Sequence, residues 1–146
     1  MGAWGYGIFD DDSAYDVMEE LQQCDDVAAY LEKTFVNGVS AEYLEFDEGI
    51  AVSVCGAVFD SILHGTSYRF DGFNSTAGSE IDGTEQYLNW IAEIKTSDCT
   101  HLKTEAVKAM ESLISEQSEL CELWADAGEF QDWKNTYLEI IQRMNA

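Results

Sequence analysis

A fifteen-residue stretch in the middle of the chain, GIAVSVCGAVFDSIL at residues 49–63, constrains the fold more than any other segment. Its β-branched residues and the alternation of Ile50, Val52 and Val54 suit a strand. The whole run from Ala41 to His64 is longer than ordinary strands, and its length favours a buried helix instead. Small residues within it would let neighbouring backbones approach closely. We therefore expect a buried helix and keep the strand open as the alternative.

Helical periodicity is clearest in the last third of the chain. Apolar residues recur at helical spacing between Asp98 and Ala127, which predicts one long helix that Gly128 ends. A second helix follows, and its apolar stripe consists of Phe130, Trp133, Tyr137, Ile140, Ile141 and Met144. The first of these helices would bury one face and expose an acidic one.

Three earlier helices are predicted from a capping residue followed by apolar residues at helical spacing. Asp12 or Ser13 would cap the first, Asp25 or Asp26 would cap the second, and Asp82 would open the third. The second of them would close at Gly38, and Gly, Ser, Thr and Asp dominate residues 65–83, which predicts a long exposed loop. The expected fold is all-α: a single helical domain over residues 1–146, built as a compact bundle of about six helices with one long loop.

The charge of the chain is strongly negative. Acidic residues number 29 against 7 basic ones, which gives a formal net charge of −22. Residues 1–48 hold 13 acids and the single base Lys33, so over half of the excess lies in the first third. Such a surface repels nucleic acid and anionic membranes, because phosphate binding needs Lys and Arg. Basic proteins or cations are the expected partners.

The cysteines and the hydropathy pattern indicate the compartment. The four cysteines show no C-x-x-C motif and no metal-ligand spacing, which is typical of free thiols in a reducing compartment. No stretch of 18 uncharged apolar residues exists, and the first apolar run is too short and too acidic for a signal peptide. We expect a cytoplasmic protein.

The opening stretch, MGAWGYGIFDDDSAYD, suggests either a helix cap or a cation site. Its glycines permit tight backbone approach, so that Trp4 and Phe9 can fold back onto the core. Asp10, Asp12 and Asp16 are the weak candidates for a metal site, but the calcium-loop pattern is not met. Carboxylates before a first helical turn satisfy orphan amides. Capping is favoured, and no metal or cofactor is predicted.

The same stretch resembles the amino-terminal signature of a bacterial family, domain of unknown function 4259, which reads M-G-A-W-G-x-G-x-F-D-N-D-x-A-x-D. SELCELWADAGEFQDW, at Ser118–Trp133, is similar to that family's closing S-E-L-x-x-L-W-x-E-x-G-x-x-x-x-W. Asp11 and Asp126 stand where the family commonly has Asn and often has Glu. The resemblance implies a compact, mostly helical domain and no established reaction, so no catalytic residues are carried over. The residues assigned to the structural motif are Gly2, Trp4, Gly5, Gly7, Phe9, Asp10, Asp12, Asp16, Trp124, Gly128 and Trp133.

Few residues suit catalysis. His64 and His101 are the only imidazoles; His64 sits at a predicted helix end, and His101 lies beside Cys99 as a weak thiol-site hint. Nucleotide-binding and hydrolase motifs are absent from the sequence. Aromatic residues of the last third are more typical of core than of a ligand box. The segment Ser67–Phe73 is either a docking loop or a cover over the core, and the sequence leaves both open. No enzymatic activity is predicted.

The leading hypothesis is a non-catalytic protein-binding module that docks a basic partner, such as a toxin or nuclease, as immunity proteins and nucleic-acid mimics do. The acidic side chains expected to face the partner are Asp11, Asp12, Asp16, Glu19, Glu20, Glu119, Glu122 and Asp126. One alternative is that the acidity serves solubility or adaptation to salt. Another is a small-molecule or metal-binding enzyme whose pocket is lined by the loop at residues 65–83.

Overall fold

The computed structural model describes residues 8, 12–68, 83–94, 100–126 and 128–145, and the structural account concerns these residues. They form seven α-helices and one short 3-10 helix. The bounds are α1 Asp12–Gln23, α2 Val27–Ser40, α3 Phe46–His64, α4 Gly83–Ile94, η1 Thr100–Leu102, α5 Lys103–Leu113, α6 Glu119–Ala125 and α7 Phe130–Asn145. The all-α class and the compact bundle are confirmed, with one helix more than expected.

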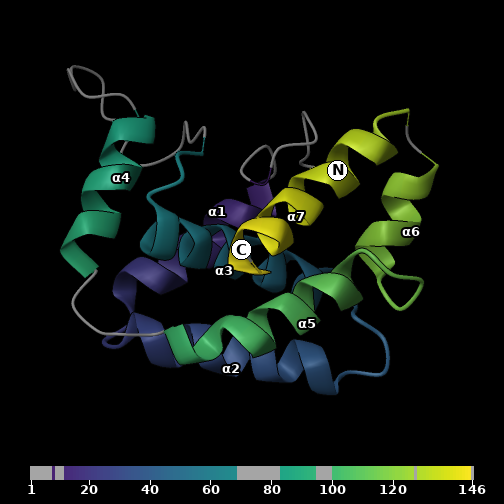
Figure 1. Ribbon diagram of the computed structural model, residues 1–146, viewed down its shortest axis with the longest axis horizontal. Helices are drawn as coiled ribbons and strands as arrows, with labels where there is room; N and C mark the ends of the chain where they lie inside the picture. The colour runs from purple at the N-terminus through teal and green to yellow at the C-terminus, as the bar shows by residue number, and fades with distance from the viewer. Residues whose placement is uncertain (1–7, 9–11, 69–82, 95–99, 127, 146) are drawn as a thin grey trace.

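Helix α3 is the centre of the bundle. It packs against α1, α2, α4, α5, α6 and α7, and Figure 1 shows it in the middle with α4 and α6 at opposite ends of the molecule. Every residue from Val52 to Ile62 is buried, as expected of a helix that is apolar on all sides. Gly56 permits this packing, because a Cβ there would lie 2.8 Å from the sulfur of Met110. The expected buried helix is thus confirmed and the strand alternative is wrong, although the helix begins at Phe46 and not at Ala41.

The single long helix predicted between Asp98 and Ala127 is wrong. The chain leaves α5 at Leu113 and starts α6 at Glu119, because the intervening turn pairs with the connector between α2 and α3. The Leu44 amide donates to the Gln117 carbonyl at 2.7 Å, and the Glu119 amide donates to the Leu44 carbonyl at 2.8 Å. Buried Ser118 then caps α6 by accepting a hydrogen bond from the Cys121 amide.

Some helix ends lie where the sequence predicts them, and one does not. Asp26 caps α2 by accepting from the Ala29 amide at 3.2 Å, and Gly65 ends α3 in the left-handed region with φ 69°. Gly38, however, does not end α2, which continues to Ser40. Gly38 instead allows close packing against Val52 and Ala109 of α3 and α5.

Three further predicted boundaries complete the comparison. Gly128 was predicted to end the helix that precedes it. Helix α6 instead ends at Ala125 with Asp126 as its C-cap, so Gly128 lies beyond the helix end. Helix α1 includes Asp12, and the residue before it lies outside the described part of the chain. Residues 69–82, which hold most of the predicted loop and the predicted start at Asp82, lie outside it as well.

Candidate functional site: an acidic groove on helix α3

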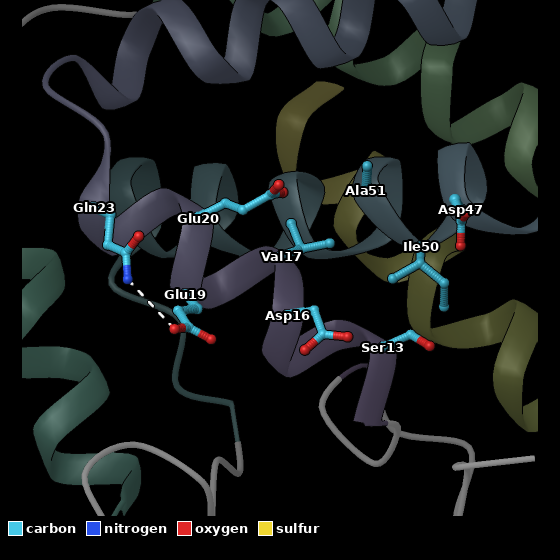
Figure 2. A pocket seen from close by; sticks show the side chains of 9 residues that line it. All are labelled: Ser13, Asp16, Val17, Glu19, Glu20, Gln23, Asp47, Ile50 and Ala51. Atoms are coloured by element: carbon cyan, nitrogen blue, oxygen red, sulfur yellow. Dashed lines mark hydrogen bonds between the residues drawn. The ribbon is translucent and has the colours of Figure 1, made fainter.

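Helices α1 and α3 enclose a surface pocket of about 460 Å³ (Figure 2). Four of its lining residues are acidic and none is Lys or Arg. The lining residues are Ser13, Asp16, Val17, Glu19, Glu20, Gln23, Asp47, Ile50 and Ala51. A pocket with this lining is a local concentration of negative charge with an apolar part formed by Val17, Ile50 and Ala51.

The amphipathic pattern of α1 explains why its carboxylates gather here. Ala14, Val17, Met18 and Leu21 are buried and recur at helical spacing, so this stripe faces the core. Asp16, Glu19 and Glu20 fall outside the stripe and are exposed on the flank that borders α3. The sequence pattern thus orients three of the carboxylates once α1 docks on α3.

Helix α3 supplies the opposite wall from its first turns. Asp47 and Ala51 are one helical turn apart on the side of α3 that is not packed against the core. Asp47 and Glu48 lie in the first turn, where the positive end of the helix dipole stabilises negative charge. The fourth carboxylate of the pocket is therefore held near a favourable helix terminus.

Hydrogen bonds fix two of the carboxylates. The Tyr30 hydroxyl, from α2, donates to Glu20 Oε2 at 2.8 Å. Burial and this hydrogen bond raise the pKa of Tyr30 well above its usual range. Gln23 Nε2 donates to Glu19 Oε1 at 3.4 Å, the bond drawn as a dashed line in Figure 2. Glu20 is thus positioned by a neighbouring helix.

A second pocket, of about 320 Å³, lies between α2 and α3 and shares Ala51 with the first. Its lining residues are Thr34, Asn37, Gly38, Ser40, Ala41, Glu48 and Ala51. Its lining is mainly small and polar, and Glu48 is its only charged residue. We call the two pockets together the acidic groove. Five carboxylates line it: Asp16, Glu19, Glu20, Asp47 and Glu48.

The remaining residues of the predicted acidic face lie elsewhere. Glu119 and Glu122 are on α6, Asp126 caps its end, and none of the three lines the groove. Glu122 accepts a hydrogen bond from Tyr43 at 2.7 Å, which raises the pKa of Tyr43 to about 12. Asp11 and the side chain of Asp12 lie outside the described part of the chain. The structure thus unites the α1 carboxylates with α3 and keeps the α6 set apart from the groove.

The amino-terminal part of the predicted structural motif also lies outside the described residues, namely Gly2, Trp4, Gly5, Gly7, Phe9 and Asp10. Its carboxyl-terminal part is described. Trp124 stacks on buried Trp133 with ring centroids 6.1 Å apart. Gly128 is exposed, with open space around it. Trp133 also contacts Phe130 and Tyr137, so these aromatic side chains pack together at the start of α7.

The metal candidates are only partly described, because Asp10 and the side chain of Asp12 are not. Among the side chains that the structure does describe, no three His, Cys, Asp or Glu residues are grouped to hold a metal ion. His101 is exposed in η1, and its neighbour Cys99 lies outside the described ranges. The proposed thiol pair is therefore not placed.

One polar cluster, centred on buried Asp60, was not predicted as a site, although the sequence singles out His64 and the segment that holds Tyr68 separately. Asp60 of α3 is fully buried, and Arg143 of α7 donates to its two carboxylate oxygens through Nε and Nη2 at 2.7–3.2 Å. The Tyr68 hydroxyl donates to Oδ2 at 2.5 Å, and His64 Nδ1 lies 2.8 Å from Oδ1. Burial alone raises the pKa of Asp60, but these hydrogen bonds, led by that from Arg143, lower it below its ordinary value.

A sequence signal for this cluster exists. Asp60 is the only charged residue within the apolar run at residues 49–63, and His64 follows it by one helical turn. A lone acid in a buried helix needs a partner. The sequence left open whether Ser67–Phe73 is a docking loop or a cover over the core. The Tyr68 side chain of this segment folds back onto the core, because its hydroxyl donates a hydrogen bond to Asp60. Residues 69–73 lie outside the described part of the chain.

None of the helices in the described part of the chain combines the length and the hydropathy that a membrane span requires. Neither a curated protein nor a solved structure matches the chain. A family model does match, the domain of unknown function DUF4259, over residues 2–136. This match covers nearly the whole sequence and agrees with the two end motifs, and the chain therefore belongs to the DUF4259 family.

Proposed function

We propose that this protein is a non-catalytic binding module whose acidic groove docks a basic partner protein. The observation that carries the proposal is the α1–α3 pocket, where four carboxylates meet and no Lys or Arg is among the lining residues. Charged groups of one sign in a concave site focus the field and raise the local concentration of oppositely charged ligands.

The lining of the groove suits Lys or Arg side chains in particular. Val17 is buried beneath the pocket, and Ile50 and Ala51 add apolar surface beside the carboxylates. Lys and Arg bury their methylene stems on apolar surface while the charged head finds a polar partner. Asp16 and Asp47 stand on opposite walls, so a cationic head inserted between the helices would have carboxylates on two sides.

The charge of the whole molecule supports fast association. A net charge of −22 attracts a cationic partner from a distance and repels nucleic acid. Exposed charge interactions are screened beyond a Debye length of about 8 Å at physiological ionic strength. The complex should therefore form rapidly at low salt and weaken steeply as salt is added.

The competing explanation is that the acidity serves solubility or salt adaptation. The α6 carboxylates, which lie outside the groove, are compatible with this explanation. The two explanations differ in whether position matters. A docking site requires the groove carboxylates in particular, whereas solubility depends on total charge only.

The experiment therefore compares variants of equal charge. D16N/E19Q/E20Q removes three groove carboxylates, and E111Q/E129Q/E139Q removes three exposed carboxylates from other surfaces. The E119Q/E122Q/D126N variant removes the three carboxylates of the α6 set, of which Glu122 and Asp126 are exposed. Binding to a lysine- and arginine-rich peptide and to a panel of basic nucleases is measured by calorimetry at low and at physiological salt.

The groove variant should bind at least about tenfold more weakly than the E111Q/E129Q/E139Q control, because each exposed pair contributes roughly 0.5 kcal/mol and tenfold is 1.4 kcal/mol. Equal losses in the groove variant and this control would favour solubility. A larger loss in the α6 variant than in the groove variant would move the docking site to α6. No binding of the wild-type protein at low salt would overturn the proposal.

A further inference from the structure

His64 stands apart from the acidic groove at the opposite end of α3, where its ring is held by the buried Asp60 carboxylate. The His64 Nδ1 to Asp60 Oδ1 distance is 2.8 Å, and Asp60 also accepts hydrogen bonds from Arg143 and Tyr68. An ionised carboxylate only accepts hydrogen bonds. The proton of the neutral His64 ring must therefore be on Nδ1, and this leaves the lone pair on Nε2.

The other edge of the ring is open to solvent. The His64 side chain is 29% exposed, although the carboxylate that orients it is fully buried. Within the described residues, Nε2 has no hydrogen-bond partner. The Arg143 side chain contacts the same Asp60 oxygen, Oδ1, as His64 and is 35% exposed. Its Nε and Nη2 atoms make its hydrogen bonds to Asp60 and Tyr68. Nη1 of Arg143 has no hydrogen-bond partner in the described part of the chain.

We propose that His64 is a phosphoryl-accepting imidazole, with Nε2 as the nucleophile. In the step, the Nε2 lone pair forms a bond to the phosphorus of a small phosphoramidate donor. The donor reacts as its zwitterion, in which the nitrogen on phosphorus is already protonated. The phosphorus–nitrogen bond breaks, and the nitrogen leaves as ammonia with the electron pair of that bond. The ring keeps its proton on Nδ1 and becomes an imidazolium that carries the phosphoryl group.

Asp60 assists this step through charge. The ring changes from neutral to cationic as the bond forms, and a carboxylate 2.8 Å from Nδ1 stabilises that developing charge. Arg143 donates to the same carboxylate oxygen that His64 contacts, and its Nη1 is the donor for the oxygens of the incoming group. Asp60 and Arg143 are positioning residues here, because neither forms a bond to phosphorus.

The chain carries its own internal control. His101 is the only other histidine, and it is exposed in η1. Among the described residues, no carboxylate holds its ring. Because both histidines reach solvent, faster labelling of His64 than of His101 would report how Asp60 orients the His64 ring, and not the solvent exposure of a histidine.

Two measurements test the proposal on the full-length protein. The first is the ¹⁵N chemical shifts of the two rings at neutral pH, which distinguish the tautomers directly. The second is incubation with potassium phosphoramidate, followed by site mapping of the phosphoryl group by mass spectrometry and ³¹P NMR. The variants are H64Q, H101Q and D60N/R143Q. The double variant removes both charges at once, because D60N alone would leave Arg143 without its carboxylate.

We expect the Nδ1–H tautomer at His64. We also expect Nε2 of His64 to be labelled at least about tenfold faster than His101, because a partner that orients a histidine changes its reactivity by about this factor. H64Q should abolish this label, and H101Q should keep it. D60N/R143Q, if folded by circular dichroism, should reduce His64 to the rate of His101. Equal labelling of the two histidines, labelling at Nδ1 or an Nε2–H tautomer would each overturn the proposal, and the wild-type protein alone decides all three.

Discussion

Arg143 in the last turn of α7 donates to both carboxylate oxygens of the fully buried Asp60 in α3, 83 positions away in the sequence. This pair joins the central helix to the carboxyl-terminal helix. Hydrogen bonds from Tyr68 and His64 complete the acceptor sites of the carboxylate. A buried charge is tolerated only when it is paired and hydrogen-bonded in this way.

Removal of Arg143 should therefore destabilise the fold. R143Q leaves the buried Asp60 charge without its main partner, which costs about 3 kcal/mol, the low end of the range because Arg143 is partly exposed. R143K keeps the charge but loses the two-pronged geometry, so its loss should be smaller. Urea denaturation of the three proteins measures both losses. If R143Q and the wild type had the same midpoint and the same m-value, the pair would not stabilise the fold.

The pH dependence of stability follows from the same carboxylate. The pKa of Asp60 is lower in the folded protein than its ordinary value of 3.8. Its contribution to stability is therefore complete above the unfolded pKa and is lost as the pH falls through the folded pKa. Urea midpoints between pH 7 and pH 3 should fall more steeply in the wild type than in D60N/R143Q. Parallel curves for the two proteins would contradict this origin of acid sensitivity.

Gly56 provides a test of the packing around α3. In G56A the new methyl group would lie 2.8 Å from the sulfur of Met110, and overpacking of this kind costs about 1–3 kcal/mol. G128A is the matched control, because nothing lies within 4 Å of a Cβ at Gly128. Thermal unfolding should show a clear loss for G56A and almost none for G128A. Similar melting temperatures for the two variants would mean that α3 has room to move away from α5.

Ser118 tests the unexpected break between α5 and α6. Its hydroxyl accepts from the Cys121 amide at 3.2 Å and is buried, so S118A should cost about 1 kcal/mol through loss of the cap. S67A, in an exposed position after α3, serves as the control. Chemical denaturation measures the difference. A stability of S118A equal to that of S67A would show that the pairing with Leu44 alone sets the break.

Much of the fold was predictable because the deciding forces are local. The α7 stripe of Trp133, Tyr137 and Ile140 is buried as its spacing indicates. The Asp26 cap and the helix end at Gly65 also follow from short-range chemistry. For these elements the periodicity and the capping residues were sufficient.

The remaining features depend on partners distant in sequence. The break after Leu113 is set by backbone pairing of Leu44 with Gln117 and Glu119, which no helical periodicity reveals. The Asp60–Arg143 pair likewise forms only when α7 docks on α3. In the groove, the α1 carboxylates were predicted as a set, whereas Asp47 joins them through tertiary packing. Long-range pairing accounts for each of these differences.

A basic ligand is expected to bind in the acidic groove, and mapping the residues that it contacts shows whether it does. Backbone ¹⁵N–¹H spectra of the full-length protein are recorded while a lysine- and arginine-rich peptide is added at low salt. We expect the largest shifts on α1 around Asp16 and Glu20 and on the first turns of α3 at Asp47 and Ala51, and we expect added salt to reverse them. Shifts spread evenly over all acidic surfaces, or centred on α6, would contradict binding in the groove.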